Sequence, residues 1–201
     1  MRICHRHLMR AACVSVFAFA VTVSASCQRT PDPAPAPPAS PYRATATIRD
    51  LMQSVVAPSA QGMWDAVGTI SNPKGTVNLE PKSDAEWAAV RRHAIALVES
   101  TNLLVIPGRH IAPPDATTLR ADDADPGAEL PPAEIEKRVL ANWPAWTAMA
   151  HALHDSAMSM LKTIEAKDAR GLESTGSDLD GVCESCHLTF WYPPRPAAPA
   201  K

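Results

Sequence analysis

The stretch LDGVCESCHLTF, residues 179–190, lies close to the C-terminus and carries more structural information than any other part of this chain. It ends an amphipathic segment in which apolar residues recur every three or four positions, so we expect one helix from about Asp168 to Phe190. Within it, Cys183 and Cys186 are separated by two residues and followed directly by His187. Residues three positions apart lie on the same side of a helical turn, so both thiols should face one way.

This C-x-x-C-H spacing is the pattern of covalent haem attachment. Two thiols on one turn can form thioether bonds to the two vinyl groups of a haem, and the adjoining imidazole of His187 is then placed to ligate the iron. A C-x-x-C pair without the histidine would fit zinc or a redox dithiol equally well, and a redox or structural pair beside an incidental histidine is the alternative. We therefore expect one covalent haem c, held by Cys183, Cys186 and His187.

Residues 1–26 have the features of an export signal. Three arginines within residues 1–10 precede an uncharged apolar run, residues 11–25, which is too short for a spanning helix. Small residues then precede Cys27, as at a bacterial lipoprotein cleavage site, although a serine stands where a leucine is usual. We expect Cys27 to become a lipidated N-terminus that anchors the protein to a membrane. The alternative is ordinary signal cleavage nearby, which would leave one free thiol.

Low-complexity segments flank the rest of the chain. Residues 27–43 are rich in proline and should form an extended tether, and residues 193–201 form a Pro/Ala-rich tail. Residues 44–192 between them are enough for one domain with one core. We expect this domain on the periplasmic side of a bacterial membrane, either lipid-anchored or soluble in the periplasm.

Charge and motifs exclude several classes of function. Without the three signal arginines the chain has 16 Lys and Arg against 21 Asp and Glu, and it has no basic stripe of the kind that binds nucleic acid. It contains no G-x-S-x-G, no H-E-x-x-H and no glycine-rich phosphate loop. The acidic residues at 122–125 lack the rest of a calcium loop and are expected to be solvated. We therefore expect a protein that is not an enzyme.

The domain is expected to be all-α, because its apolar residues follow a helical period and no stretch alternates as a strand would. Pro58 should kink or interrupt the first helix, and Ser83 with Glu86 forms a capping box that opens the second. Four amphipathic helices with one long connection are typical of a four-helix bundle. The expected helices are residues 45–67, 83–104, 142–164 and 168–190, with a short helix at 132–141 after a long loop.

With C-x-x-C-H on the last of four helices, residues 44–192 resemble the class II c-type cytochromes, the cytochrome c prime group. Ordinary class I cytochromes carry this motif near the N-terminus instead. The resemblance implies a haem between the helices, with His187 as the proximal ligand on the fourth. It also implies that a residue on the first helix faces the other side of the iron. That residue is Met in six-coordinate, electron-transferring members and apolar in five-coordinate, gas-binding members.

The sequence Arg49-x-x-Met52 is similar to the six-coordinate members. By this resemblance Met52 is the distal iron ligand and Arg49 pairs with a haem propionate. Three alternatives remain open from the residues themselves. Met63 lies three helical turns further on, His151 and His154 could supply a second imidazole, and the distal position could be open.

We therefore expect an exported electron carrier that exchanges single electrons with redox partners of the respiratory or periplasmic chain. The alternative is a five-coordinate protein that binds nitric oxide or carbon monoxide, with Val55 or Val56 lining an apolar distal pocket. A homodimer would fit the family. No nucleic-acid partner is expected.

Overall fold

Three long helices and one broken helical segment dominate the described part of this computed structural model, residues 41–117 and 129–192. The long helices are α3 (Asp84–Leu104), α5 (Trp143–Glu165) and α6 (Ala169–Phe190). The broken segment consists of α1 (Ile48–Leu51), the π-helical turn η1 (Met52–Val56) and α2 (Ala57–Trp64). The described residues are thus mostly helical, as expected, and the three long helices begin and end within two residues of the predicted positions.

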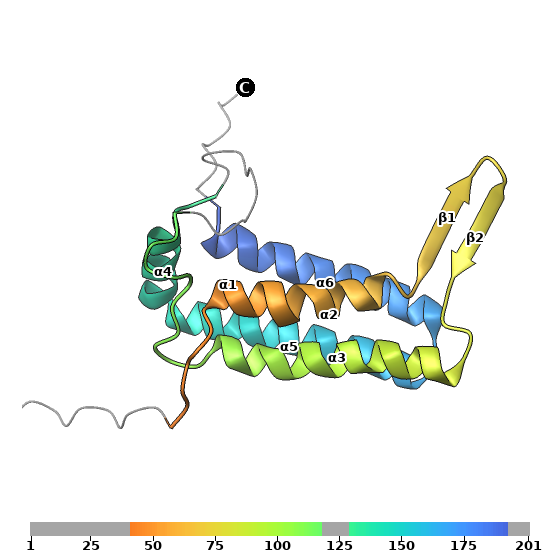
Figure 1. Cartoon of the computed structure of the whole chain (residues 1–201), viewed down its shortest axis with the longest axis horizontal. Coiled ribbons are helices and arrows are strands. Elements are labelled where there is room, and N and C mark those ends of the chain that lie inside the picture. Colours follow the sequence, from red (N-terminus) through yellow and green to blue (C-terminus); the bar gives the residue numbers. More distant parts are fainter. Residues whose placement is uncertain (1–40, 118–128, 193–201) are drawn as a thin grey trace, which may run out of the picture. The chain divides into compact units, whose positions relative to one another are not determined.

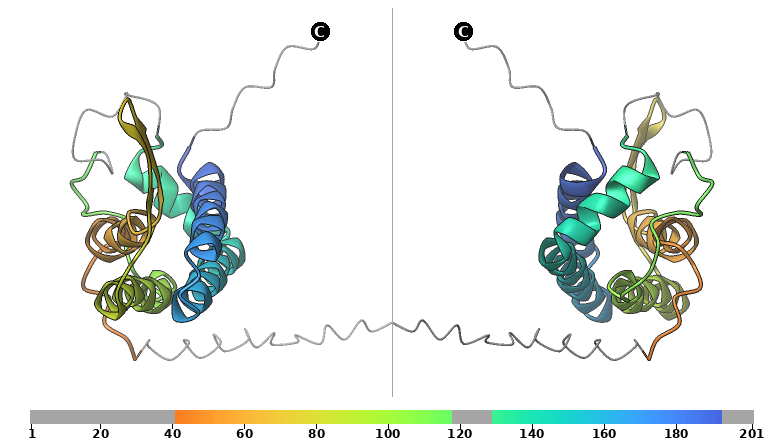
Figure 2. Two further views of the ribbon diagram at one scale, coloured as in Figure 1. Left: turned by 90° about the vertical axis from the view of Figure 1, so that its right-hand side faces the viewer. Right: turned by 90° about the vertical axis from the view of Figure 1, so that its left-hand side faces the viewer.

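The four helical segments run side by side, as Figure 1 shows. Helix α3 packs against α5, α5 against α6, and α2 against both α3 and α6. The end-on views in Figure 2 show them around a shared interior. Side chains from all four fill that interior, including the fully buried Met63, Leu97, Met160 and Leu179. The short helix α4 (Pro132–Ala141) was expected, and it contacts α5 and α6.

Two tryptophan side chains bond neighbouring helices together. The Trp64 indole N–H donates to the Gly176 carbonyl oxygen on α6 (3.0 Å), and the Trp146 indole N–H donates to the Leu104 carbonyl oxygen at the end of α3 (2.9 Å). Gly176 leaves room for this contact, because a Cβ there would lie 3.1 Å from the Trp64 ring. These bonds satisfy indole donors that would otherwise be buried without a partner.

Side-chain caps define where the helices begin. Ser83 and Glu86 form the predicted capping box of α3, and Thr47 and Asp50 form an equivalent box at α1. Asp168 caps α6 by accepting a hydrogen bond from the Gly171 N–H (3.0 Å). Each cap satisfies a backbone N–H that has no partner within the helix.

Ionisation of Glu86 should make the stability of the protein depend on pH. Its carboxylate accepts backbone hydrogen bonds from Lys82 (2.6 Å) and Ser83 (2.8 Å), which lower the pKa of Glu86. A lowered pKa in the folded state contributes stability above the ordinary glutamate pKa, and this contribution is lost as the pH falls through the lowered value. Glu86→Gln should therefore be less stable than the parent protein at pH 7 in urea denaturation. The difference should begin to close near pH 4, around the usual glutamate pKa of about 4.3; a difference independent of pH would contradict this account.

The disturbance predicted at Pro58 takes the form of the π-helical turn η1. The Ala57 N–H bonds to the Met52 carbonyl oxygen, five residues back instead of four. Pro58 has no N–H to donate, and its ring clashes with the carbonyl four residues earlier in a regular helix. A wider turn before the proline relieves that clash, so helical structure continues from α1 through to Trp64.

A β-hairpin between α2 and α3 contradicts the expectation that the domain contains no strand. Strands β1 (Gly68–Asn72) and β2 (Gly75–Leu79) pair antiparallel, with Ile70 opposite Val77. Gly68 and Gly75 have φ values of 142° and 134°, which favour glycine. Apart from Gly68 every strand residue is exposed, so no face is buried and the apolar alternation that normally reveals a strand is missing.

Contact between α2 and α3 leaves no room for a side chain at Gly62 unless the His93 ring moves. A Cβ placed there would lie 2.6 Å from two atoms of the His93 ring, closer than real Cβ contacts. We expect Gly62→Ala to push this half-buried ring aside, so that the variant lacks the stabilisation of roughly 0.5–1 kcal/mol that alanine usually gives over glycine inside a helix. Gly181→Ala on α6 is the matched control, because a Cβ there meets nothing within 4 Å.

That control should instead stabilise the protein by roughly 0.5–1 kcal/mol, the usual gain when alanine replaces glycine inside a helix. Urea denaturation of both variants measures the two effects. Equal effects from both variants would show that the close approach at Gly62 costs nothing.

Several expectations concern residues outside the described ranges. These are the export signal at residues 1–26, lipidation of Cys27, the acidic group at 122–125, the tail at 193–201 and most of the tether. Among the described helices, none has the length and apolar character needed to cross a membrane.

Candidate haem site

A cavity of about 360 Å³ lies between the broken segment α1–η1–α2 and helix α6, with α5 forming a further wall. Its lining is mainly apolar, and Val56, Ala60, Met149 and Leu153 are among the residues that form it. Cofactor pockets in proteins typically have volumes of roughly 300–1,000 Å³ and apolar walls with a few placed polar groups. The cavity therefore has the size and character of a cofactor site.

Cys183, Cys186 and His187 all line this cavity from α6. They share one side of an uninterrupted helix, as their spacing predicted, and each is partly buried. Both thiols are free of disulfide bonds. The structure thus brings the two cysteines and the histidine of the motif to a single apolar space.

The two thiols are kept neutral by their surroundings. Burial raises the pKa of Cys183 to about 11, and the negative charge of Asp180 adds to the effect. Burial also raises the pKa of Cys186 to about 11, with a further contribution from Cys183. Reactive cysteines have the opposite environment, in which a nearby positive charge or a helix N-terminus lowers the thiol pKa.

The imidazole of His187 is also held in its neutral form. Burial lowers the pKa of His187, and the negative charges of Glu184 and Glu129 only partly oppose that effect. The ring centroid lies 5.8 Å from that of Trp191 and 6.4 Å from that of Tyr192. A neutral imidazole has a free lone pair, which is the form that binds metal ions.

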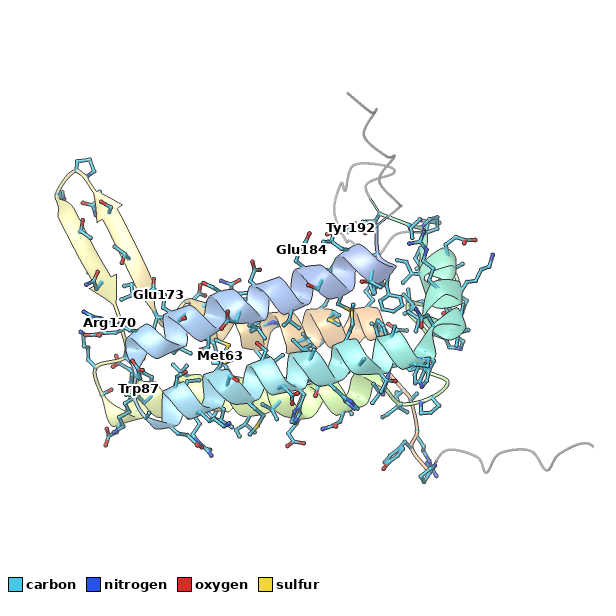
Figure 3. All side chains as sticks on the ribbon, turned by 180° about the vertical axis from the view of Figure 1, so that it is seen from behind. Met63, Trp87, Arg170, Glu173, Glu184 and Tyr192 are labelled. Carbon is cyan, nitrogen blue, oxygen red and sulfur yellow. The ribbon has the colours of Figure 1, made fainter. Side chains whose placement is uncertain are left out.

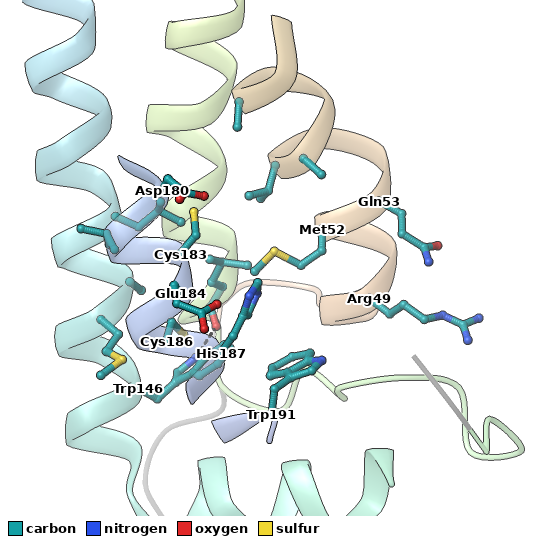
Figure 4. Close-up of a pocket in the computed structure, with 18 of the residues that line it drawn as sticks. Arg49, Met52, Gln53, Trp146, Asp180, Cys183, Glu184, Cys186, His187 and Trp191 are labelled. Atoms are coloured by element: carbon teal, nitrogen blue, oxygen red, sulfur yellow. Dashed lines mark hydrogen bonds between the residues drawn. The ribbon is translucent and has the colours of Figure 1, made fainter. Parts of the chain in front are cut away.

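Met52 faces this group from the first helical segment. It belongs to the π-helical turn, is half-buried and lines the cavity. In Figure 4 its side chain extends toward α6, with His187 and Trp191 close by, whereas Arg49 and Gln53 extend in the opposite direction. Met52 thus lines the same space as His187, while the charged end of Arg49 points away from α6.

The other candidate ligands do not line the cavity. Met63 is completely buried in the helical interior, as Figure 3 illustrates, and is not part of the lining. His151 is exposed and His154 lies next to Asp155, with Nδ1 3.3 Å from a carboxylate oxygen. Among residues 41–117 and 129–192, no three His, Cys, Asp or Glu side chains converge as a set of metal donors.

Some lining residues were not singled out by sequence reasoning. Glu129 reaches the cavity from the loop before α4, and Trp64 from the end of α2. Trp146 reaches it from α5. No local pattern distinguishes such residues, because their position depends on how the helices pack.

Neither a family model, nor a curated protein, nor a solved structure matches this chain. The geometry of the cavity and the chemistry of the residues around it are therefore the basis for the function proposed below.

Proposed function

We propose that this protein is a c-type cytochrome that carries single electrons through one covalently bound haem. The observation that carries the proposal is that Cys183, Cys186 and His187 line the same apolar cavity as Met52. Such a cytochrome uses two cysteine thiols to attach the haem through thioether bonds. It uses a neutral imidazole and a methionine sulfur to ligate the iron. The protein would be a class II member, with its four long helical segments arranged as a four-helix bundle.

The residues present fit a haem in three respects. The cavity volume falls within the range of cofactor pockets, and its walls are mainly apolar. The thiols and the imidazole lie along one helical face. Arg49 and Gln53 also belong to the lining, and they are the polar side chains of the first helical segment that charged propionate groups would need as partners.

Each residue has a distinct role in this proposal. Cys183 and Cys186 would hold the cofactor covalently, and His187 and Met52 would be the protein ligands of its iron. A bound haem supplies an iron that gains and loses one electron. The thioether of Met52 is soft and neutral, so it favours ferrous iron and raises the reduction potential. Two protein ligands leave no position for gaseous ligands.

A redox-active dithiol is the competing interpretation of Cys183 and Cys186. Such a function requires an accessible thiolate near neutral pH. Burial instead raises the pKa of both thiols to about 11, so both remain protonated at pH 7. This environment favours structural attachment of a cofactor over thiol–disulfide exchange.

The cellular setting is part of the same proposal. Lipidation at Cys27 and the proline-rich tether of residues 27–43 would hold the cytochrome domain near the periplasmic face of a bacterial membrane. There it would exchange electrons with proteins of the respiratory or periplasmic chain, as a monomer or a homodimer.

The mass and optical spectrum of the purified mature protein test this function. We expect the mass of one covalent haem and a low-spin ferric spectrum with the long-wavelength charge-transfer band of Met–iron ligation. Addition of carbon monoxide to the reduced protein should leave the spectrum unchanged. A mass without haem would refute the cytochrome proposal.

A high-spin spectrum that changes with carbon monoxide would instead identify the second candidate, a gas-binding protein. Val56 favours that candidate, because it is buried and lines the cavity one turn beyond Met52. It would form part of an apolar distal wall if Met52 did not reach the iron.

A further inference from the structure

A carboxylate beside His187 has an oxygen atom without a hydrogen-bond partner. Glu129 lines the cavity, and its Oε2 is buried and makes no hydrogen bond. The His187 ring also makes no hydrogen bond to any residue in the described ranges. An unpaired acceptor and an unpaired donor therefore line the same cavity.

The position of Glu129 is held by the C-terminal end of α6. The next residue along the chain, Leu130, donates its backbone N–H to the Trp191 carbonyl oxygen (2.9 Å). Arg138 on α4 donates to the Tyr192 carbonyl oxygen (3.1 Å), which holds the same end of the helix from a second side. These bonds fix the backbone beside Glu129 four to five residues beyond His187.

The electrostatic effect of Glu129 on His187 also indicates that the two side chains are near each other. The negative charge of Glu129 acts on the imidazole, opposing the burial that lowers the pKa of His187. Glu184 also lines the cavity and acts on the imidazole more strongly, but it is exposed to solvent. Water and salt screen an exposed charge, whereas a buried carboxylate oxygen needs a donor to offset its lost hydration.

We propose that Glu129 accepts a hydrogen bond from the His187 ring N–H that does not face the iron, and thereby sets the reduction potential of the haem. The inference rests on the function proposed above. An imidazole that ligates a metal through one nitrogen almost always donates its other N–H to a carboxylate or carbonyl. Such a partner fixes the ring orientation and increases the basicity of the ligand.

Glu129 is thus a positioning residue that acts on the iron through His187. A more basic, negatively polarised imidazole stabilises ferric over ferrous iron and lowers the potential. It would therefore oppose the effect of Met52, which favours ferrous iron. The potential of the protein would reflect the balance of these two residues on opposite sides of the cofactor.

Redox titration of haem-loaded Glu129→Gln tests this role, because the substitution removes the charge and keeps the size of the side chain. We expect the ferric–ferrous equilibrium to shift toward ferrous at least tenfold, a rise in potential of about 59 mV or more for one electron. Glu184→Gln is the matched control, since it removes an equally charged but exposed carboxylate near the same ring. Its shift should be less than twofold and should disappear at high salt.

Proton exchange in the unmodified protein provides a second, independent test. Nuclear magnetic resonance of the ferric protein should show a His187 ring N–H that exchanges slowly with solvent because Glu129 accepts it. Exchange as fast as in free imidazole would overturn the proposal, even if Glu129→Gln does not fold. If Glu129→Gln has a normal Met–His haem spectrum and an unchanged potential, the role of Glu129 is overturned but the proposed function is not. Absence of covalent haem from the unmodified protein would overturn the proposed function and this inference with it.

Discussion

On the proposed function, replacement of Met52 by leucine is expected to abolish six-coordinate ligation of the iron while the haem stays covalently attached. Leucine fills a similar volume, so the cavity wall and the helix packing should be retained. The charge-transfer band of the ferric protein should disappear, and carbon monoxide should bind to the reduced variant but not to the unmodified protein. The reduction potential should fall on the order of a few hundred millivolts, within the roughly 0.8 V span that axial ligands set.

Met149→Leu is the matched control for this substitution. Met149 lines the same cavity from α5, and the change again replaces a thioether by a hydrocarbon of similar size. The control should keep the band, the potential and the resistance to carbon monoxide. Retention of the band in Met52→Leu would show that another residue ligates the iron.

Replacement of Trp146 by alanine is expected to lower the free energy of unfolding strongly. The indole is 2% exposed, lies edge-on to the Phe190 ring at a centroid distance of 5.4 Å, and donates to the Leu104 carbonyl oxygen (2.9 Å). Loss of a buried tryptophan side chain costs about 3–5 kcal/mol. Urea denaturation of the purified protein, followed by far-ultraviolet circular dichroism, measures this loss.

Trp146→Phe separates packing from hydrogen bonding. Phenylalanine keeps an aromatic ring against Phe190 but leaves the Leu104 carbonyl without its donor. That unpaired group costs about 1–3 kcal/mol, so this variant should be clearly more stable than Trp146→Ala. Equal losses in the two variants would show that the lost hydrogen bond to Leu104, and not the ring packing against Phe190, accounts for the destabilisation.

The helices were predictable because their signals are local. The Ser83–Glu86 capping box and Asp168 define the first turns of α3 and α6, and apolar periodicity follows directly behind them. The hairpin of residues 68–79 could not be recognised in the same way. Its side chains are exposed on both faces, so burial left no alternating pattern in its sequence.

The residues of the candidate site also differ in whether a local sequence signal identifies them. Cys183, Cys186 and His187 were found from spacing alone, because three neighbours on one helix need no tertiary information. Met52 came from resemblance to a family, since several methionines occupy apolar helical positions and periodicity does not rank them. Glu129 was missed because its place in the cavity lining depends on a loop held by a hydrogen bond from Leu130 to the C-terminal end of α6.

The exposed hairpin offers a practical way to immobilise the protein. Its strands contribute no buried side chain, and the Pro73-Lys74 turn joins them at the end of the helices opposite the C-terminus of α6 (Figure 1). A cysteine or affinity peptide introduced at that turn would bind the molecule to an electrode by an element that supports neither the core nor the cavity. Voltammetry could then compare many variants on one surface with every molecule attached at the same point.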